Sequence, residues 1–153
     1  MLINGTKRTK NHFYGIICSY FNNFDLMKYT LDKTERYALL QIHVDKIDAV
    51  KTPQLKTELT TLNAEGFANF IIDFTEVKYI DSSGLSSILL ANRLCDQSGG
   101  IFIMYGLSDQ VKKLIHISQL DKVLHILPTK EEAIDAIFLH EIENDLKTGD
   151  TKE

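Results

Sequence analysis

The sequence contains only two cysteines, and their positions exclude the usual cysteine-based sites. Cys18 and Cys95 have neither the CxxC spacing of a redox centre nor the spacing of zinc ligands. A chain of 153 residues can bury about two-thirds of its unfolded surface, so folding requires no disulfide. We therefore expect a reduced protein located in the cytoplasm.

An excess of positive charge and long apolar runs are also missing. Lysine and arginine total 17 against 21 acidic residues, which gives a formal net charge of −4. Direct binding of nucleic acid across the surface is therefore not expected. No apolar run is long enough for a transmembrane helix, so we predict no association with a membrane. The length fits one domain.

The common enzyme motifs are absent as well. The sequence has no GxxxxGK[ST] phosphate loop, no GxGxxG dinucleotide motif and no GxSxG nucleophile elbow. No two histidines lie three or four residues apart, so no helix face offers a histidine pair to a metal. Asp73 and Glu76 flank the end of an apolar run, where loop capping explains both. We predict that the protein is not an enzyme and holds no metal.

The first 26 residues differ in composition from the rest. This segment contains three basic residues, Lys7, Arg8 and Lys10, and one acidic residue, Asp25. It is rich in asparagine and aromatic residues, and no helical or strand period persists through it. A secretory signal, a tail that touches a membrane or a partner, and a disordered extension are all open interpretations. We favour a mis-assigned start, because Met27 directly precedes the first regular pattern.

From Met27 onward, strand and helix patterns alternate. Strands are predicted at residues 29–35, 37–44, 70–74, 101–105 and 123–127, the third of them buried on both faces. The first two are joined by the tight turn Glu35-Arg36 and are therefore expected to be antiparallel. This alternation predicts an α/β domain with a small mixed sheet of about five strands and about four helices.

The helix boundaries follow from capping residues. Thr52 is predicted to cap a helix whose first residue is Pro53, and Gly66 is predicted to end it. Ser108 is expected to cap a short helix, and Thr129 with Glu132 forms a capping box before the final one. We predict a folded domain over residues 27–146, followed by a polar, disordered tail over residues 147–153.

One segment, residues 81–84, contains more small and polar residues than the cap of a helix needs. A buried strand leads through a turn to Asp81-Ser82-Ser83-Gly84 at the start of a helix. A side-chain oxygen there can accept a hydrogen bond from an N–H group of the first turn. One serine hydroxyl can cap while the other stays exposed, and Gly84 can leave room for an approaching group. A phosphate at this position would face the positive end of the helix dipole.

The order of these motifs resembles the STAS domain family, and within it the bacterial anti-sigma factor antagonists. Asp81-Ser82-Ser83-Gly84-Leu85, preceded by Ile71-Ile72-Asp73-Phe74, is similar to the family signature. The resemblance continues through Gly99-Gly100-Ile101-Phe102-Ile103, residues 108–114 and Leu120-Asp121-Lys122-Val123, and spans residues 27–142. It implies the STAS fold, a mixed sheet with helices mainly on one side, and no cofactor.

The resemblance also implies a partner switch. In this family the unmodified antagonist binds an anti-sigma factor that is also a serine kinase, and so releases a sigma factor. The kinase then phosphorylates the antagonist, here at Ser82 or, as second candidate, Ser83, and a PP2C-type phosphatase reverses the modification. Asp48 matches a family aspartate that lies near the phosphoacceptor. The implied partner-binding residues are Asp48, Asp81, Ser82, Ser83, Gly84 and Leu85.

The sequence departs from the family pattern at one turn, and it leaves two questions open, the role of three apolar residues and the function of the domain. Gln119 stands where the family commonly has glycine, which puts the turn geometry there in question. Leu85, Ile88 and Leu107 could form either an apolar partner surface or part of the core. A non-switching STAS module, such as a subunit of a lipid-transport or scaffold assembly, is the alternative function.

Overall fold

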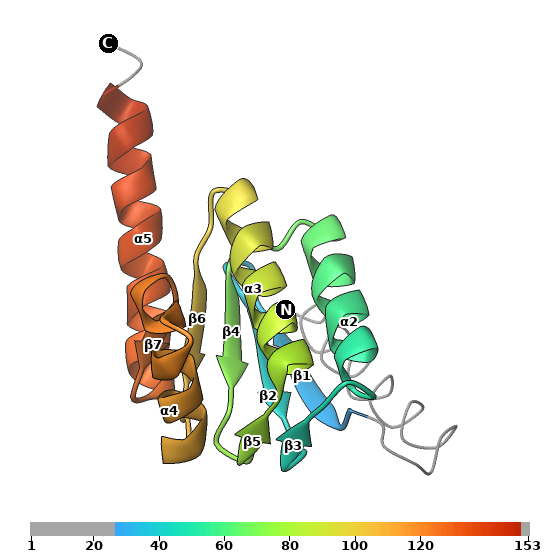
Figure 1. The fold of residues 1–153 in the computed structure, drawn as a ribbon. Coiled ribbons are helices and arrows are strands. Elements are labelled where there is room, and N and C mark those ends of the chain that lie inside the picture. The colour runs from blue at the N-terminus through green and yellow to red at the C-terminus, as the bar shows by residue number, and fades with distance from the viewer. Residues whose placement is uncertain (1–26, 151–153) are drawn as a thin grey trace.

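The computed structural model describes residues 27–150, which are built around a five-stranded mixed sheet (Figure 1). The spatial order of the strands is β1-β2-β4-β6-β7. Their bounds are Tyr29–Lys33, Ala38–Ile42, Phe70–Asp73, Phe102–Tyr105 and His125–Leu127. β1 is antiparallel to β2, and every other pair in this sheet is parallel. The predicted mixed sheet and its antiparallel opening pair are confirmed.

A second, two-stranded sheet was not predicted. It consists of β3 (Lys46–Ile47) and β5 (Tyr79–Ile80), which pair in parallel. Two residues are too few to produce the alternation by which a strand is recognised in a sequence. This small sheet is nevertheless important, because each of its strands leads directly into the candidate site.

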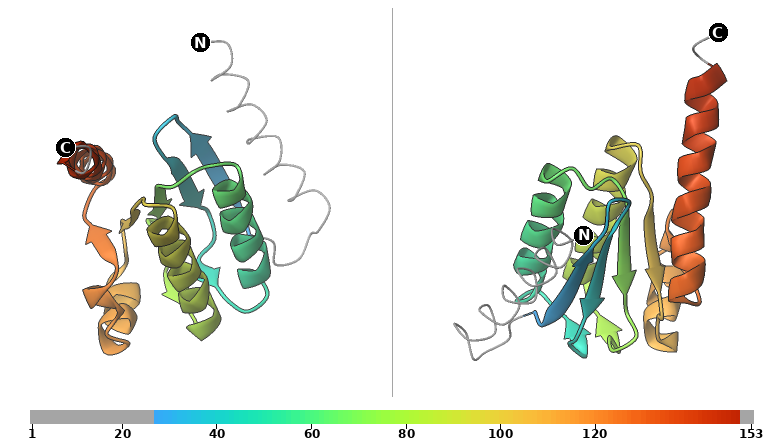
Figure 2. Two further views of the ribbon diagram at one scale, coloured as in Figure 1. Left: turned by 90° about the horizontal axis from the view of Figure 1, so that it is seen from above. Right: turned by 180° about the vertical axis from the view of Figure 1, so that it is seen from behind.

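Helices cover both faces of the main sheet (Figures 1 and 2). Their bounds are α2 Thr52–Ala64, α3 Ser82–Gln97, α4 Asp109–Ile117 and α5 Lys130–Asp150, with a short 3-10 helix, η1, at Leu120–Lys122. The larger core contains the buried hydrophobic residues of α2, α3 and α4. The smaller core lies against α5, on the opposite face. The expectation that helices pack mainly on one side is confirmed.

The central strands contribute side chains to both cores. Ile71 and Ile103 belong to the smaller core, whereas their neighbours Ile72 and Met104 belong to the larger one. Successive side chains of a strand point to opposite faces, so both faces must be apolar when both are covered. This explains the nearly continuous apolar run that starts at Phe70.

Several predicted boundaries need correction. Thr52 is the first residue of α2 rather than its cap, and Lys51 occupies the cap position without a side-chain hydrogen bond. β7 begins only at His125, because the N–H groups of Val123 and Leu124 both donate to the Leu120 carbonyl in the turn that ends η1. α5 continues to Asp150, so residues 147–150, predicted as disordered tail, are helical. Residues 1–26 and 151–153 lie outside the described part, and the predictions for them stay predictions.

Two kinds of feature are absent from the described residues. Along residues 27–150, none of the helices combines the length and the hydrophobicity needed to cross a bilayer. The same residues contain no group of three histidine, cysteine or acidic side chains placed to hold a metal ion. Cys95 lies in the core, where burial raises the pKa of its thiol to about 12.

Gln119 adopts a left-handed backbone, with φ of 59° and ψ of 21°, and is the one non-glycine residue with positive φ in residues 27–150. The turn after α4 therefore has the geometry that suits glycine, although glutamine occupies it. We expect Gln119→Gly to raise the free energy of unfolding by about 1 kcal/mol, because a left-handed non-glycine residue costs about that much or more. The melting temperature should rise by about 2–4 °C in a thermal melt.

Gln119→Ala is the matched control, because alanine keeps the Cβ atom that disfavours this backbone conformation. Its melting temperature should stay close to that of the natural protein. A lower melting temperature for Gln119→Gly would show that the glutamine side chain stabilises the turn more than its backbone strains it.

Candidate functional site

The small β3–β5 sheet brings two loops together at one end of the domain. Ile47 is in register with Ile80, and the Asp81 N–H donates to the Ile47 carbonyl at 3.2 Å. Asp48, which follows Ile47, therefore lies beside Asp81, which follows Ile80. This register places Asp48 next to the start of α3, where Ser82 is the first helical residue.

Asp81 is the cap of α3. Its backbone is extended, and its Oδ1 accepts a hydrogen bond from the Gly84 N–H at 2.9 Å. The capping oxygen thus belongs to the carboxylate, and the expectation that one of the two serine hydroxyls caps the helix is wrong. Among residues 27–150, no group forms a hydrogen bond with the hydroxyl of Ser82 or of Ser83.

The two serines differ in exposure. Ser82 is exposed, whereas Ser83 is partly buried. The hydroxyl groups of the next two serines are already used, since Ser86 donates to the Ser83 carbonyl and Ser87 to the Gly84 carbonyl. Of the four serines in the first turns of α3, Ser82 is the most accessible to another protein.

Gly84 has a packing role that differs from the predicted one. A Cβ atom added here would lie 2.3 Å from Cγ1 of Ile80 and 3.1 Å from Cγ2 of Ile47. The glycine therefore lets α3 pack closely on the β3–β5 sheet. The expectation that it leaves room for a group from outside is wrong, because the space is filled by these two isoleucines.

Three apolar residues for which partner surface and core were both open interpretations lie in the core. Leu85 is 8% exposed, Ile88 0% and Leu107 7%. All three belong to the larger core. Leu85 was also among the partner-binding residues implied by the family; the structure shows that its side chain packs in the core, and its contact with a partner stays a prediction.

Asp48 is held in a fixed position at the start of α2. Its Oδ1 accepts hydrogen bonds from the N–H groups of Val50 and Lys51, and Thr52 donates its hydroxyl to the Asp48 carbonyl at 2.7 Å. Burial acts to raise the pKa of the Asp48 carboxyl, but the Lys51 N–H and ammonium and the Val50 N–H outweigh it and lower that pKa. Asp48 is therefore anionic at neutral pH.

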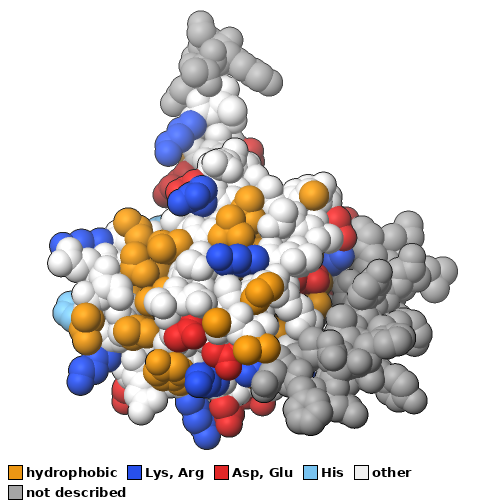
Figure 3. Space-filling model, turned by 45° about the vertical axis from the view of Figure 1, so that its right-hand side comes forward, with side chains coloured by type: hydrophobic (Ala, Val, Ile, Leu, Met, Phe, Trp, Pro, Cys, Tyr) orange, Lys and Arg blue, Asp and Glu red, His pale blue; other side chains and the backbone are white. Residues whose placement is uncertain are grey.

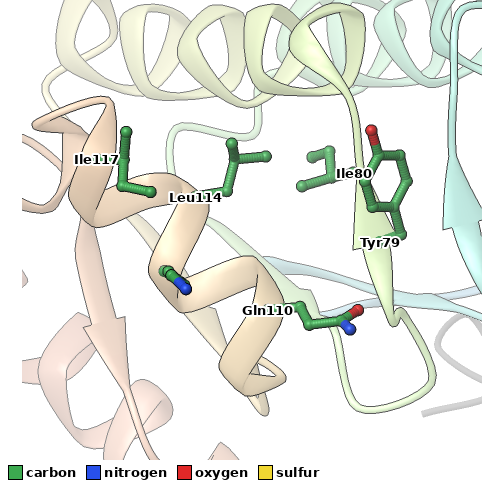
Figure 4. A pocket seen from close by; sticks show the side chains of 6 residues that line it. Tyr79, Ile80, Gln110, Leu114 and Ile117 are labelled. Atoms are coloured by element: carbon green, nitrogen blue, oxygen red, sulfur yellow. The ribbon is translucent and has the colours of Figure 1, made fainter.

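An apolar groove adjoins the serines and was not predicted. It has a volume of about 310 Å³ and lies between β5 and α4 (Figure 4). Tyr79 and Ile80, which line it, are followed directly by Asp81 and Ser82. The other lining residues are Gln110, Lys113, Leu114 and Ile117. The groove combines residues from two elements that are distant in the sequence, so no local pattern could reveal it.

The surface of the domain is chemically mixed. On the face drawn in Figure 3, small groups of hydrophobic side chains are separated by acidic and basic ones. At the groove, Tyr79 and Ile117 are exposed by 48% and 67%, and the Lys46 ammonium lies 5.5 Å from the centre of the Tyr79 ring. Exposed aromatic and aliphatic side chains with charged groups beside them resemble the apolar centre and polar rim of a protein–protein interface.

Comparison with known families and proteins agrees with this architecture. Residues 29–133 match the STAS domain family. The chain belongs to the STAS domain family. This STAS domain is 32% identical over 89 residues to the anti-sigma-B factor antagonist of Listeria monocytogenes, covering 55% of this chain and 78% of that protein. It is 23% identical over 101 residues to the protein of the same name from Staphylococcus aureus, covering 65% of this chain and 94% of that protein.

Solved structures confirm the STAS fold. An anti-sigma factor antagonist from Mycobacterium paratuberculosis superimposes with a TM-score of 0.65 at 21% identity, covering 72% of this chain and 93% of that one. The anti-sigma factor antagonist SpoIIAA in its unphosphorylated form gives 0.63 at 23% identity, covering 71% and 95%. The Bacillus protein SpoIIAA in its phosphorylated form gives 0.58 at 23% identity, covering 71% and 98%.

Proposed function

We propose that this STAS protein is an anti-sigma factor antagonist in the cytoplasm, switched off by phosphorylation of Ser82. Unmodified, it binds an anti-sigma factor that is also a serine kinase, and so releases a sigma factor. The kinase then transfers phosphate to Ser82, and a PP2C-type phosphatase removes it. The observation that carries the proposal is an exposed serine beside Asp48 and Asp81 whose hydroxyl takes no part in capping the helix. The relatives of the chain that are named anti-sigma-B factor antagonists support the same function.

The position of Ser82 suits a kinase substrate. Its hydroxyl is exposed at the first residue of α3, and Asp81 rather than the serine completes the helix cap. A kinase can therefore use the hydroxyl without breaking a contact that holds the helix. Phosphate is also compatible with this position, because a helix N-terminus favours negative charge.

The charges around Ser82 suit a switch. A phosphoserine carries about −1.5 to −2 charges at neutral pH. Asp48 and Asp81 already supply two carboxylates beside it. A partner surface that accepts a neutral hydroxyl would then face bulk, like charge and the cost of removing water from the phosphate. Phosphorylation is therefore suited to separate the two proteins without unfolding this one.

The groove between β5 and α4 offers the partner a second contact. Its apolar residues lie next to the modifiable serine, so one partner surface can cover both. Apolar contacts supply affinity that does not depend on the phosphate, while Ser82 controls whether the surfaces can close. The alternative, a non-switching interaction module, uses the same fold but gives Ser82 no role.

Incubation with the partner kinase and ATP tests the proposal. We expect mass spectrometry to show a gain of one phosphate in the natural protein, no gain in Ser82→Ala, and an undiminished gain in the matched control Ser83→Ala. The kinase to test is an anti-sigma factor that binds this protein, and one encoded beside it would be the first candidate. Phosphorylation of Ser82→Ala at the natural level would contradict the site, and the absence of any binding to the kinase would support the non-switching module.

A further inference from the structure

We infer that Lys51 binds the phosphate of phosphorylated Ser82, exchanging its present contact with Asp48 for one with the phosphate. This inference rests on the proposed function, because it concerns the phosphorylated state. It assigns a role to a residue that no family motif or sequence pattern singled out.

Lys51 is an unusual lysine in its burial. The residue is only 9% exposed, although lysine is among the residue types least often buried. Its ammonium lies 3.7 Å from Oδ2 of Asp48, which is a long contact for an ion pair. Within residues 27–150, the ammonium has no other ion-pair or hydrogen-bond partner. Most of its donor capacity is therefore unused, since an ammonium has three N–H groups.

The fold places Lys51 at the same end of the domain as Ser82. Lys51 directly precedes α2 at its cap position, and Ser82 is the first residue of α3. The two helices run side by side on one face of the sheet (Figure 1). Asp48, the partner of Lys51, lies beside Asp81 through the register of β3 and β5. The axes of packed helices are about 8–10 Å apart, a distance that a lysine and a phosphoserine can bridge together.

The phosphate is a stronger acceptor for the ammonium than Asp48 is. It has three acceptor oxygens and about −1.5 to −2 charges, against one charge on the carboxylate. Asp48 also keeps the N–H groups of Val50 and Lys51 as hydrogen-bond donors if the ammonium leaves. The exchange therefore leaves the partly buried Asp48 carboxylate with hydrogen-bond donors.

Other charged groups lie near Ser82, but the lysines among them are exposed to solvent, whereas Lys51 is buried. Lys46 of β3, Lys78 before β5 and Lys113 of α4 are all exposed, while Asp48 and Asp81 are the nearby acids. Ions and water screen exposed charges much more than buried ones. The attraction between the phosphate and Lys51 is therefore expected to be stronger than its attraction to any of the three exposed lysines.

A 31P NMR titration of the full chain tests the inference. Phosphoserine is placed at position 82 during synthesis, so no kinase is required. We expect the midpoint of the phosphate titration to rise by about half a pH unit in Lys51→Met, because an opposite charge nearby favours the dianion. The control Lys56→Met removes the same charge farther along α2 and should titrate like the natural protein. Equal midpoints for Lys51→Met and the natural protein would overturn the inference.

A second measurement does not depend on the folding of a variant. The 15N and 1H signals of the Lys51 ammonium are compared in the natural protein with and without phosphate on Ser82. We expect them to shift on phosphorylation and to follow the pH titration of the phosphate, and unchanged signals would overturn the inference. If no kinase modifies Ser82 but these shifts occur, the proposed function fails while the Lys51 contact stands.

Discussion

Gly100→Ala is expected to lower the free energy of unfolding by about 3 kcal/mol, at the upper end of what overpacking costs. A Cβ atom at this position would lie 1.9 Å from the carbonyl oxygen of Ala68 and 2.3 Å from its carbon. Both are backbone atoms, so no side-chain rotation can relieve the clash.

The neighbouring hydrogen bonds prevent the two segments from moving apart. The Phe70 N–H donates to the Ile101 carbonyl at 3.1 Å, and the Ile101 N–H donates to Oδ1 of Asn69 at 3.0 Å. Both bonds involve Ile101, the residue directly after Gly100, and hold the beginnings of β4 and β6 together there. Relief of the clash would therefore break the pairing of two central strands.

Urea denaturation measures the effect. The midpoint for Gly100→Ala should fall clearly, and the melting temperature should fall by about 6–12 °C. The matched control is Gly149→Ala near the end of α5, where a Cβ atom would meet nothing within 4 Å. An unchanged midpoint for Gly100→Ala would show that the backbone between α3 and β6 is much more adaptable than the structure indicates.

Phosphate on Ser82 is expected to weaken the complex with the anti-sigma factor by about 5- to 150-fold, which corresponds to about 1–3 kcal/mol. The phosphate adds charge beside Asp48 and Asp81, and it adds bulk two residues after Ile80, which lines the apolar groove. Isothermal titration calorimetry of the phosphorylated and unmodified full chains against the anti-sigma factor gives the ratio directly. Ser82→Ala should bind like the unmodified protein.

Phosphoserine at position 98 is the matched control. Ser98 is also exposed but follows the other end of α3, after Gln97. The same added charge there should leave the affinity nearly unchanged. Equal losses at both positions would indicate a general effect of net charge, and equal affinities with and without phosphate on Ser82 would contradict the switch.

The main elements of the fold could be predicted because their apolar patterns are long enough. The run from Phe70 has the continuous hydrophobicity of a strand covered on both faces, and Leu55, Leu59 and Leu62 repeat at helical spacing. The prediction failed where local signals are weak. β3 and β5 have two residues each, and α5 runs on through a polar segment that was predicted to be disordered.

The sequence predicted which residues form the candidate site, but it did not predict how these residues contact one another. The motif around Ser82 indicated Asp81, and the resemblance to the family indicated Asp48. The structure explains the proximity of the two through a strand pair that no pattern revealed. Gly84 was misinterpreted because a sequence does not say whether the space beside a glycine is open or filled. Lys51 escaped notice because its burial depends on packing between segments that are distant in the sequence.

Transcription from a promoter of the released sigma factor tests the central claim most directly. RNA polymerase, the sigma factor and its anti-sigma factor are combined with GTP, CTP, UTP and the β,γ-imido analogue of ATP, and this protein is added with Ser82 either unmodified or phosphorylated. RNA polymerase breaks the α–β bond of this analogue and can incorporate it, whereas a kinase cannot transfer its terminal phosphate. We predict that the unmodified protein restores transcription and that the phosphorylated protein does not at the same concentration. Equal restoration by both forms would contradict a switch at Ser82, and restoration by neither would contradict the antagonist function itself.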